Sequence, residues 1–438
     1  MVSNLTVLMN GLHVGTLSKA SNGAHSFVYS ETWLTQRGRR PISLSLPLRS
    51  DRFEGDEVFN FFDNLLPDNP AVRDRIVVRH QASTTQPFDL LAKVGRDAVG
   101  AITLLPEDEP TPDHTIIDAK PLTEDEVEAV LKGYLSDAPL GMIDEQDDFR
   151  ISIAGQQEKT ALLWHNGYWN IPKGLTPTTH IIKLPIGELP TAEHTLDLTT
   201  SVDNELVCMR LSEAFGIPTA HCDLLVANEM RVLAVERFDR RLSSDGSHYL
   251  RLPFEDFCQV NGLPSATKYE SHGGVGIASI MKTLSLSENP EDRRTFMRSQ
   301  ILFWLLAAID GHSKNFSIGI GVEGRYHLAP LYDILSAYPM LGGKGLNHRK
   351  LKLAMSHKGS SGREYRWAKV LPRHFGHTAR EVGLKIPELN ALLQEFADTK
   401  DAVIDKVAQN LPTDINEEVR DRIFTGLNAT ASNITDVT

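Results

Sequence analysis

The hydrophobic pattern of the first fifty residues predicts strands. Residues 5–9 and 12–17 are mainly apolar and flank Asn10-Gly11. Both turn residues tolerate the positive φ angles of a two-residue hairpin, so this stretch predicts a β-hairpin. Residues 42–47 alternate apolar and small polar side chains at the period of a strand, which predicts another extended segment.

The next segments complete a first domain. Residues 58–66 are rich in apolar side chains and precede Pro67, which predicts a buried helix that stops there. Residues 98–105 predict a closing strand. We therefore expect an α+β N-terminal domain at residues 1–106, followed by an acidic, proline-rich surface linker that begins at residue 107.

The remaining pattern changes several times. Thr123 with Glu126 three positions later predicts a capped helix within a connection at residues 107–145. Strand-like patterns begin near residue 146, whereas residues 206–215 and 301–309 are predicted to be helical. Beyond residue 383 the spacing is helical again, and the small, polar end of the chain predicts a flexible tail at residues 426–438.

Composition is that of a globular protein with more than one domain, since 438 residues exceed what one core usually serves. The longest apolar run, residues 301–309, is far shorter than the roughly 20 residues that a membrane-spanning helix needs. Residues 1–17 carry no Lys or Arg, so we expect neither a secretory signal nor a membrane segment, and a cytoplasmic location.

Charge and cysteine content exclude further classes. The formal net charge of −12 disfavours a sequence-blind nucleic-acid binder. The three cysteines are scattered and odd in number, which predicts neither a disulfide framework nor a zinc site.

Candidate chemistry follows the long apolar run. Asp310 and Asn315 have the Asp-x-x-x-x-Asn spacing of a kinase catalytic loop, and a second acid, Asp333, follows downstream. Phosphoryl transfer needs one acid to orient a hydroxyl, and an Asn and another acid to hold magnesium on the phosphates. The three residues together predict a kinase.

Two upstream segments suit the phosphates of a nucleotide. Ala154 and Gly155 lie in a strand-like alternation at residues 149–160, where small residues would let a hairpin backbone approach phosphates; an ordinary hairpin is the alternative. Lys183 closes the β-branched run that begins at His180 and needs an anionic partner there. Glu205 is the candidate helix glutamate that would pair with Lys183, and Asp203 is an equally plausible partner. The alternative is that Lys183 simply reaches water at the end of its strand.

Two more segments complete the order expected of a kinase. Residues 232–240 lead from an apolar strand into charge, and backbone groups of Glu236 and Phe238 could pair with an adenine edge; a strand followed by a salt-bridged turn is the alternative. Residues 326–333 predict a strand pair that leads to Asp333, which would bind magnesium. A lysine strand, a hinge, an Asp-x-x-x-x-Asn motif and a later Asp occur in the right order.

These motifs resemble the HipA family of bacterial toxin kinases. The matching stretches are residues 148–155, 178–185, 235–241 and 310–317, with further similarity at residues 59–67 and 88–100. The resemblance covers about residues 1–410. It implies a serine/threonine-protein kinase that uses ATP and Mg²⁺. The implied fold is α+β: a two-lobed protein-kinase-like (phosphatidylinositol-kinase-like) C-terminal part, with an N-lobe at 146–238 and a helical C-lobe at 239–425, and a smaller N-terminal domain.

The resemblance also implies roles for individual residues. Asp310 would be the catalytic acid, and Asn315 and Asp333 the metal ligands. The full set of implied ATP-binding residues is Ala154, Gly155, Gln156, Gln157, Glu158, Lys159, Lys183, Glu236, Arg237, Phe238, His312, Ser313, Lys314, Asn315, Tyr332 and Asp333.

Regulation and partners are implied in the same way. Ser152 matches the autophosphorylated serine of the family, and its phosphate would add negative charge beside the phosphate loop, which we expect to eject the loop and switch the enzyme off. The implied partners are a helix-turn-helix antitoxin, HipB, operator DNA bound by the pair, and glutamyl-tRNA synthetase as the substrate whose phosphorylation inhibits translation and promotes persistence. Arg380 and Lys385 roughly match two DNA-contacting residues, although Glu381 intervenes; a solvated helix end is the alternative.

Two other functions use the same residues. A small-molecule kinase of the phosphotransferase type would share the fold and the Asp/Asn/Asp set. A nucleotide-binding corepressor without catalysis would need the nucleotide site but not the catalytic acid.

Overall fold

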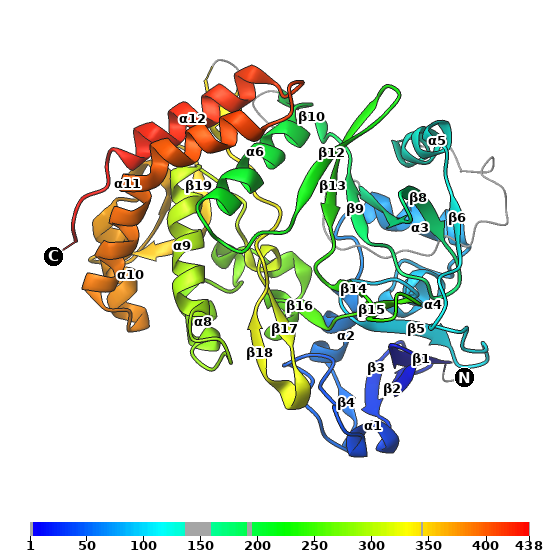
Figure 1. The fold of residues 1–438 in the computed structure, drawn as a ribbon. Coiled ribbons are helices and arrows are strands. Elements are labelled where there is room, and N and C mark those ends of the chain that lie inside the picture. Colours follow the sequence, from blue (N-terminus) through cyan, green and yellow to red (C-terminus); the bar gives the residue numbers. More distant parts are fainter. Residues whose placement is uncertain (1–2, 136–158, 191–194, 343–344, 438) are drawn as a thin grey trace. The chain divides into compact units, whose positions relative to one another are not determined.

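A computed structural model describes residues 3–135, 159–190, 195–342 and 345–437. The chain forms two compact units (Figure 1). Unit 1 comprises Met1–Leu184, Leu225–Ala266 and Ile318–Tyr326, and unit 2 comprises Pro185–Leu224, Thr267–Ser317 and His327–Thr438. Across the described residues no helix has the length and apolar character to span a membrane.

The N-terminal part of unit 1 is a five-stranded antiparallel sheet in the order β4-β3-β2-β1-β5. Its strands are β1 (Ser3–Met9), β2 (Leu12–Lys19), β3 (His25–Tyr29), β4 (Phe53–Glu54) and β5 (Ile102–Pro106). The predicted hairpin is confirmed: Asn10 and Gly11 have φ angles of 45° and 77° between β1 and β2.

The prediction of an extended segment at residues 42–47 is wrong. The Leu46 N–H donates to the Ser43 carbonyl at 3.1 Å, so the chain turns there. The Ser43 hydroxyl accepts a hydrogen bond from the Ser45 N–H at 3.1 Å. Such a local side-chain bond favours a turn over an extended strand.

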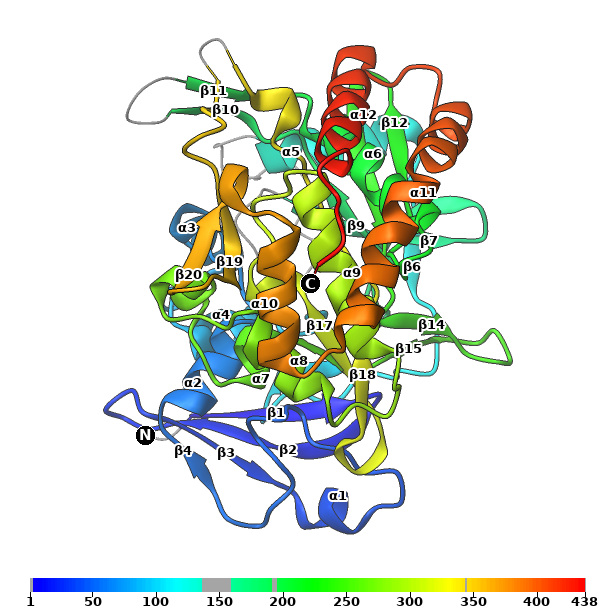
Figure 2. The same cartoon turned by 90° about the vertical axis from the view of Figure 1, so that its left-hand side faces the viewer.

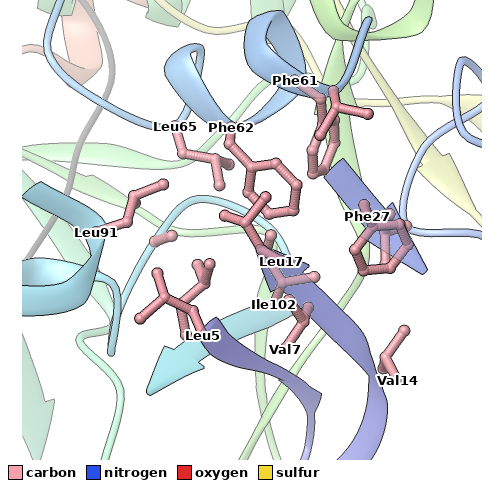
Figure 3. Close-up of a cluster of buried hydrophobic side chains, with 14 of the residues drawn as sticks. Leu5, Val7, Val14, Leu17, Phe27, Phe61, Phe62, Leu65, Leu91 and Ile102 are labelled. Carbon is pink, nitrogen blue, oxygen red and sulfur yellow. The ribbon is translucent and has the colours of Figure 1, made fainter. Parts of the chain in front are cut away.

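Four helices belong to the same N-terminal part: α1 (Glu31–Thr35), α2 (Asp56–Asp63), α3 (Pro70–His80) and α4 (Pro87–Val94). The core between sheet and helices gathers leucines of β1 and β2 with Phe61 and Phe62 of α2 (Figure 3). Helix α2 ends at Asp63, earlier than predicted. Leu65 and Leu66 lie in the turns that follow, and their side chains are buried.

The second part of unit 1 comprises most of a six-stranded sheet in the order β12-β13-β9-β7-β8-β6; only the first residues of β12 belong to unit 2. Its strands are β6 (Ala119–Pro121), β7 (Lys159–His165), β8 (Tyr168–Pro172), β9 (His180–Lys183), β12 (Cys222–Ala227) and β13 (Met230–Glu236). Helix α5 (Glu124–Leu135) has the predicted cap: the Thr123 N–H donates to Glu126 Oε2 at 2.9 Å, and the Glu126 N–H donates to Thr123 Oγ1 at 3.3 Å.

Short elements follow β13: the pair β14 (Arg240–Leu242) and β15 (Tyr249–Arg251), then β16 (Phe254–Asp256) and α7 (Phe257–Val260). Strand β16 joins β17 (Ser317–Ile320) and β18 (Tyr326–Leu328) in a three-stranded sheet. The strand pair predicted at residues 326–333 is wrong: β18 is the one strand there, and Leu331 forms an isolated bridge with Thr219.

Unit 2 is mainly helical (Figures 1 and 2). It contains α6 (Ser201–Ala214), α8 (Ile277–Leu284), α9 (Asp292–Leu305), α10 (Pro372–Val382), α11 (Ile386–Asn410) and α12 (Glu417–Ala431), with the strand pairs β10 (Gly187–Pro190)–β11 (Thr195–Leu198) and β19 (Lys352–Lys358)–β20 (Arg363–Arg366). Helices α11 and α12 pack on α6, and α10 packs against β19.

The end of the chain is more ordered than its composition predicts. Residues 428–431 complete α12, and Val437 is buried. The Asn390 side chain exchanges two hydrogen bonds with the Val437 backbone, at 3.0 and 2.9 Å.

Candidate active site

The loop that carries Asp310 begins where α9 ends. The predicted helix to residue 309 stops at Leu305 because Ala307 adopts a left-handed conformation with φ 48°. The Ala308 N–H donates to the Phe303 carbonyl at 2.8 Å and the Ala307 N–H to the Trp304 carbonyl at 3.2 Å. This is the bonding of a Schellman motif, which usually has glycine at the left-handed position.

Asp310 is exposed at the start of this loop. Its carbonyl accepts a hydrogen bond from the His312 N–H at 2.7 Å. Between them, Gly311 lies so close to Phe303 that a Cβ at this position would be 2.2 Å from the Phe303 ring. The backbone on both sides of Asp310 is therefore fixed by close packing.

Tyr269 holds the Asp310 carboxylate. The Tyr269 hydroxyl donates to Asp310 Oδ1 at 2.5 Å, a short distance typical of a bond to a charged acceptor. The rings of Tyr269 and His312 pack edge to face, with their centroids 5.1 Å apart. Burial lowers the pKa of His312 in spite of the nearby Asp310, which favours a neutral imidazole.

The segment that carries Tyr269 is fastened to the same loop. Both the N–H and the hydroxyl of Ser313 donate to the Lys268 carbonyl, at 3.2 and 2.8 Å. Because Ser313 is fully buried, these bonds are shielded from water. Tyr269 is thus held at a fixed place relative to Asp310, which lies 41 positions away in the sequence.

Asn315 and Asp333, the two predicted metal ligands, lie together. Asn315 Nδ2 donates to Asp333 Oδ2 at 2.9 Å and lies 3.4 Å from the Asp333 carbonyl. Asn315 is 2% exposed, and its Oδ1 is buried without a hydrogen-bond partner among the described residues. The amide thus turns its donor toward the acid and leaves its oxygen unpaired, which normally costs free energy.

The chain around Asp333 is anchored on both sides. The Leu331 N–H donates to the Pro218 carbonyl and the Leu331 carbonyl accepts from the Ala220 N–H, both at 2.8 Å. Beyond the acid, Ser336 and the Asn204 side chain exchange two hydrogen bonds of 2.8 Å.

Asp333 has φ 60°, a left-handed conformation that a non-glycine residue keeps only where its surroundings enforce it. Next to it, the Tyr332 hydroxyl donates to the Lys314 carbonyl at 2.8 Å. Asp310, His312, Ser313, Lys314, Asn315, Tyr332 and Asp333 are therefore gathered in one region of unit 2.

The oxygen atoms of this region fit a hard cation. Asn315 Oδ1 and the Asp333 carboxylate are the type of ligand that Mg²⁺ takes from a protein when phosphates and water complete its shell. The described residues contain no group of three or more His, Cys, Asp and Glu side chains that could hold a metal by itself. A magnesium ion at Asn315 and Asp333 would therefore take its remaining ligands from phosphates or water.

Unit 1 carries the other predicted nucleotide residues. Lys183, at the end of β9, is buried and has Lys159 of β7 and Leu233 of β13 as its Cα partners in the neighbouring strands. The two lysines lie opposite each other in register.

The side chain of Arg237 is buried and bonded within unit 1. It is 4% exposed, its Nη2 donates to Asp239 Oδ2 at 2.8 Å, and its Nη1 donates to the Thr178 hydroxyl at 3.0 Å. Its backbone N–H donates to the Thr179 carbonyl at 2.8 Å. This side chain therefore serves the interior of unit 1.

The partner of Arg237 and of two other arginines is Asp97. Asp97 Oδ1 accepts from Arg240 at 2.8 Å and lies 3.5 Å from Arg251, and Oδ2 lies 3.4 Å from Arg237. Burial alone would raise the pKa of Asp97, but these arginines and the Thr178 hydroxyl outweigh it and hold the pKa below its ordinary value. The network ties the N-terminal sheet domain to the end of β13.

The remaining predicted residues are placed as follows. Glu236 is exposed at the end of β13, and Phe238 packs edge-on against Phe254 at 4.9 Å between centroids. Arg380 and Lys385 are exposed, on α10 and immediately before α11. Ser152 and the phosphate-loop residues Ala154, Gly155, Gln156, Gln157 and Glu158 lie outside the described residues.

The candidate glutamate and its alternative both lie in α6. Glu205 is buried in the second turn of the helix rather than at its start. Asp203 accepts a hydrogen bond from the Asn416 N–H at 3.0 Å, which links α6 to the start of α12.

Two important residues were not predicted from the sequence. Tyr269 stands in an irregular segment with no recognisable motif, and only the fold brings it to Asp310. Asp97 is recognisable in the sequence as an acid between Arg96 and a short apolar run, which suggests a buried charge. Its three arginine partners are distant in sequence and could not be identified.

Comparison with known proteins gives consistent matches over most of the chain. Residues 5–105 match the family described as HipA N-terminal domain, and residues 151–405 match the HipA-like C-terminal domain. The Sinorhizobium fredii protein named "Putative kinase Y4mE" is 36% identical over 349 residues, covering 78% of this chain and 79% of that protein.

Two further matches concern named toxins. The serine/threonine-protein kinase toxin HipA of Shewanella oneidensis is 28% identical over 345 residues, covering 76% of this chain and 75% of that protein. A chain in the solved Shewanella oneidensis complex of HipA, HipB and operator DNA has a TM-score of 0.79 at 23% identity, covering 98% of this chain and 96% of that one. This structural likeness shows a shared α+β HipA-like kinase fold.

Proposed function

Because the chain belongs to the HipA family of serine/threonine-protein kinases, we propose that it transfers the γ-phosphoryl group of ATP to a serine or threonine hydroxyl of a protein. The observation that carries this proposal is the arrangement in unit 2. A fixed, exposed acid, Asp310, accompanies a buried pair, Asn315 and Asp333, whose oxygens suit magnesium.

Asp310 would receive the acceptor hydroxyl. Tyr269 occupies Oδ1, so Oδ2 is the atom that would accept the hydrogen bond of the acceptor hydroxyl and orient its lone pair toward the γ-phosphorus. The fixed carboxylate would lower the entropic cost of alignment, and phosphoryl transfer depends mainly on positioning and electrostatics.

Asn315 and Asp333 would hold the magnesium ion, which when bound neutralises charge on the phosphates. The Asn315 amide keeps its donor on Asp333 and offers Oδ1, so the two side chains orient each other. Mg²⁺ is thereby a required cofactor together with ATP.

The nucleotide itself would also need residues of unit 1. Lys159 and Lys183 supply positive charge for the phosphates, and Ala154, Gly155, Gln156, Gln157 and Glu158 would form the phosphate loop. Backbone groups of Glu236 and Phe238 would bind the adenine edge, with Arg237 as the middle residue of this hinge. His312, Ser313, Lys314 and Tyr332 would complete the site.

The biological role proposed is that of a toxin in a cytoplasmic toxin–antitoxin pair. A HipB-like helix-turn-helix antitoxin would be the partner, and the pair would bind operator DNA, to which the exposed Arg380 and Lys385 would contribute. The substrate proposed is glutamyl-tRNA synthetase, whose phosphorylation would inhibit translation and promote persistence. Autophosphorylation at Ser152 would switch the kinase off.

One experiment separates this role from the alternatives. The purified protein is incubated with ATP and Mg²⁺ together with glutamyl-tRNA synthetase, an aminoglycoside or a sugar, and phosphorylated products are mapped by mass spectrometry. The proposal predicts phosphate on the synthetase and on Ser152. Phosphorylation of a small molecule alone would favour the phosphotransferase alternative, and nucleotide binding without any product would favour a corepressor.

The regulatory part has its own test. The Ser152→Asp variant should bind ATP more weakly and lose toxicity when expressed without an antitoxin. Full ATP affinity and full toxicity in this variant would contradict inactivation by phosphorylation.

A further inference from the structure

Basic residues are concentrated in one stretch that follows Asp333. From Ile334 to Arg363 the sequence has no Asp or Glu, although the chain as a whole has 57 acids and 45 Lys and Arg. An even distribution would place about four acids in such a stretch. The stretch instead contains six basic residues: Lys344, Arg349, Lys350, Lys352, Lys358 and Arg363.

The fold brings part of this stretch together with other basic residues at one end of the β19–β20 pair. Lys352 is the Cα partner of Arg366, and the Trp367 N–H donates to the Leu351 carbonyl at 3.0 Å. The exposed basic side chains at this end are Arg349, Lys350, Lys352, Arg366 and Lys369, which we call the basic surface.

The protein itself neutralises part of the basic surface. Arg366 bonds to the Glu364 carboxylate at 3.0 and 3.1 Å. Within the described part of the chain, Arg349 and Lys352 have no carboxylate partner. Lys352 faces Arg366 on the strand pair, and Glu364 offsets the charge of Arg366 but not that of Lys352. An external anion near Arg349 and Lys352 would therefore meet two exposed cations that no carboxylate of the described residues pairs.

The basic surface lies close to the candidate catalytic acid within unit 2. The Ala354 N–H of β19 donates to the Ile309 carbonyl at 3.0 Å, and Ile309 immediately precedes Asp310. Lys352 is two residues from Ala354, about 7 Å along the strand. An extended peptide whose hydroxyl reached Asp310 would place side chains two to four positions from that hydroxyl at a comparable distance.

From these observations we infer that the basic surface binds acidic residues that flank the acceptor serine or threonine in a protein substrate. This inference rests on the proposed kinase function and adds to it the class of substrate sequence. A protein segment fits better than nucleic acid because a chain of net charge −12 with a few clustered cations repels a long phosphate backbone. The position beside Asp310 is also where an acceptor polypeptide must lie.

A binding experiment tests the inference without requiring catalysis. The full chain is titrated into a fluorescein-labelled serine peptide with glutamates at positions two to four on both sides, and into a matched peptide with glutamines. We expect at least fivefold tighter binding of the glutamate peptide, reduced by high salt because exposed charges are screened. The double variant Arg349→Glu/Lys352→Glu should abolish the preference.

The control is Lys406→Glu, which reverses an exposed lysine of α11 and should leave the preference unchanged. Equal binding of the two peptides, or a preference that survives the double variant, would overturn the inference. Tighter binding of a single-stranded RNA oligonucleotide of equal charge, lost in the double variant, would also overturn it in favour of nucleic acid.

A kinase assay separates this inference from the proposed function. With both peptides as substrates, the wild type should show a higher kcat/KM for the glutamate peptide, and the double variant should still phosphorylate the glutamine peptide at the wild-type rate. Phosphorylation of both peptides at one rate would contradict only the acidic preference. Absence of any phosphoryl transfer, with the binding preference intact, would contradict only the kinase.

Discussion

Removal of the Asp97 carboxylate should destabilise unit 1 more than most single substitutions. Asp97→Asn keeps the shape of the side chain but deletes the charge that faces Arg237, Arg240 and Arg251, all of them buried. Asp239 would then be the one acid left among these three guanidinium groups in the network described above.

The expected cost is about 3–5 kcal/mol, the range measured when one partner of a buried ion pair is removed. Because a domain is typically stable by about 5–15 kcal/mol, this is a large fraction. For a unit of this size, about 2–4 °C per kcal/mol gives a decrease in melting temperature of roughly 10 °C.

The dependence on pH identifies the cause. The pKa of Asp97 is held below its ordinary value of 3.8 in the folded protein. A depressed pKa contributes stability above the unfolded value, and this contribution is lost as pH falls below about 4. The difference between wild type and Asp97→Asn should therefore be full at pH 7 and become smaller below pH 4.

Urea denaturation followed by tryptophan fluorescence measures this difference, since Trp33, Trp164 and Trp169 lie in unit 1. Asp51→Asn is the matched control, because Asp51 is exposed, and it should change stability by less than about 0.5 kcal/mol. A loss below about 1 kcal/mol for Asp97→Asn, or a loss that stays constant from pH 3 to pH 7, would refute the reasoning.

Three further substitutions have defined outcomes. Tyr269→Phe removes a hydrogen bond to the charged Asp310, which is worth about 1.5–3 kcal/mol. The kcat should therefore fall about tenfold to 100-fold, while the KM for ATP is retained. An unchanged kcat in steady-state assays would contradict this positioning role. Gly311→Ala places a Cβ 2.2 Å from the Phe303 ring, and should lower both kinase activity and, by about 1–3 kcal/mol, stability in urea. Burial raises the pKa of Glu255 to about 8, so wild-type stability should decrease between pH 4.5 and pH 8, where this carboxyl is ionised in the unfolded chain but still protonated in the folded protein. Glu255→Gln should remove that slope, and equal slopes in wild type and variant would contradict it.

Local features of the fold were predictable from the sequence. The Asn10-Gly11 hairpin and the capping box of Thr123 and Glu126 depend on residues a few positions apart, and the structure confirms both. The end of α9 was not predictable, because Ala307 adopts a left-handed conformation that alanine rarely takes.

The candidate site was predictable only in part. The spacing of Asp310 and Asn315 predicts a catalytic loop, but the bond from Tyr269 to Asp310 depends on tertiary structure. Arg237 shows another limit: the motif does not reveal that its side chain belongs to a buried network with Asp97, 140 positions away. Sequence motifs therefore locate a site more reliably than they assign each side chain within it.

Transfer of labelled phosphate from γ-³²P-ATP is the most direct test of a kinase site built on Asp310, Asn315 and Asp333. In the presence of Mg²⁺, the wild-type protein should label itself or an added protein substrate. Asp310→Asn should still bind ATP but should transfer phosphate at least 100-fold more slowly. Labelling by Asp310→Asn at the wild-type rate would contradict the role assigned to this acid and, with it, the proposed mechanism.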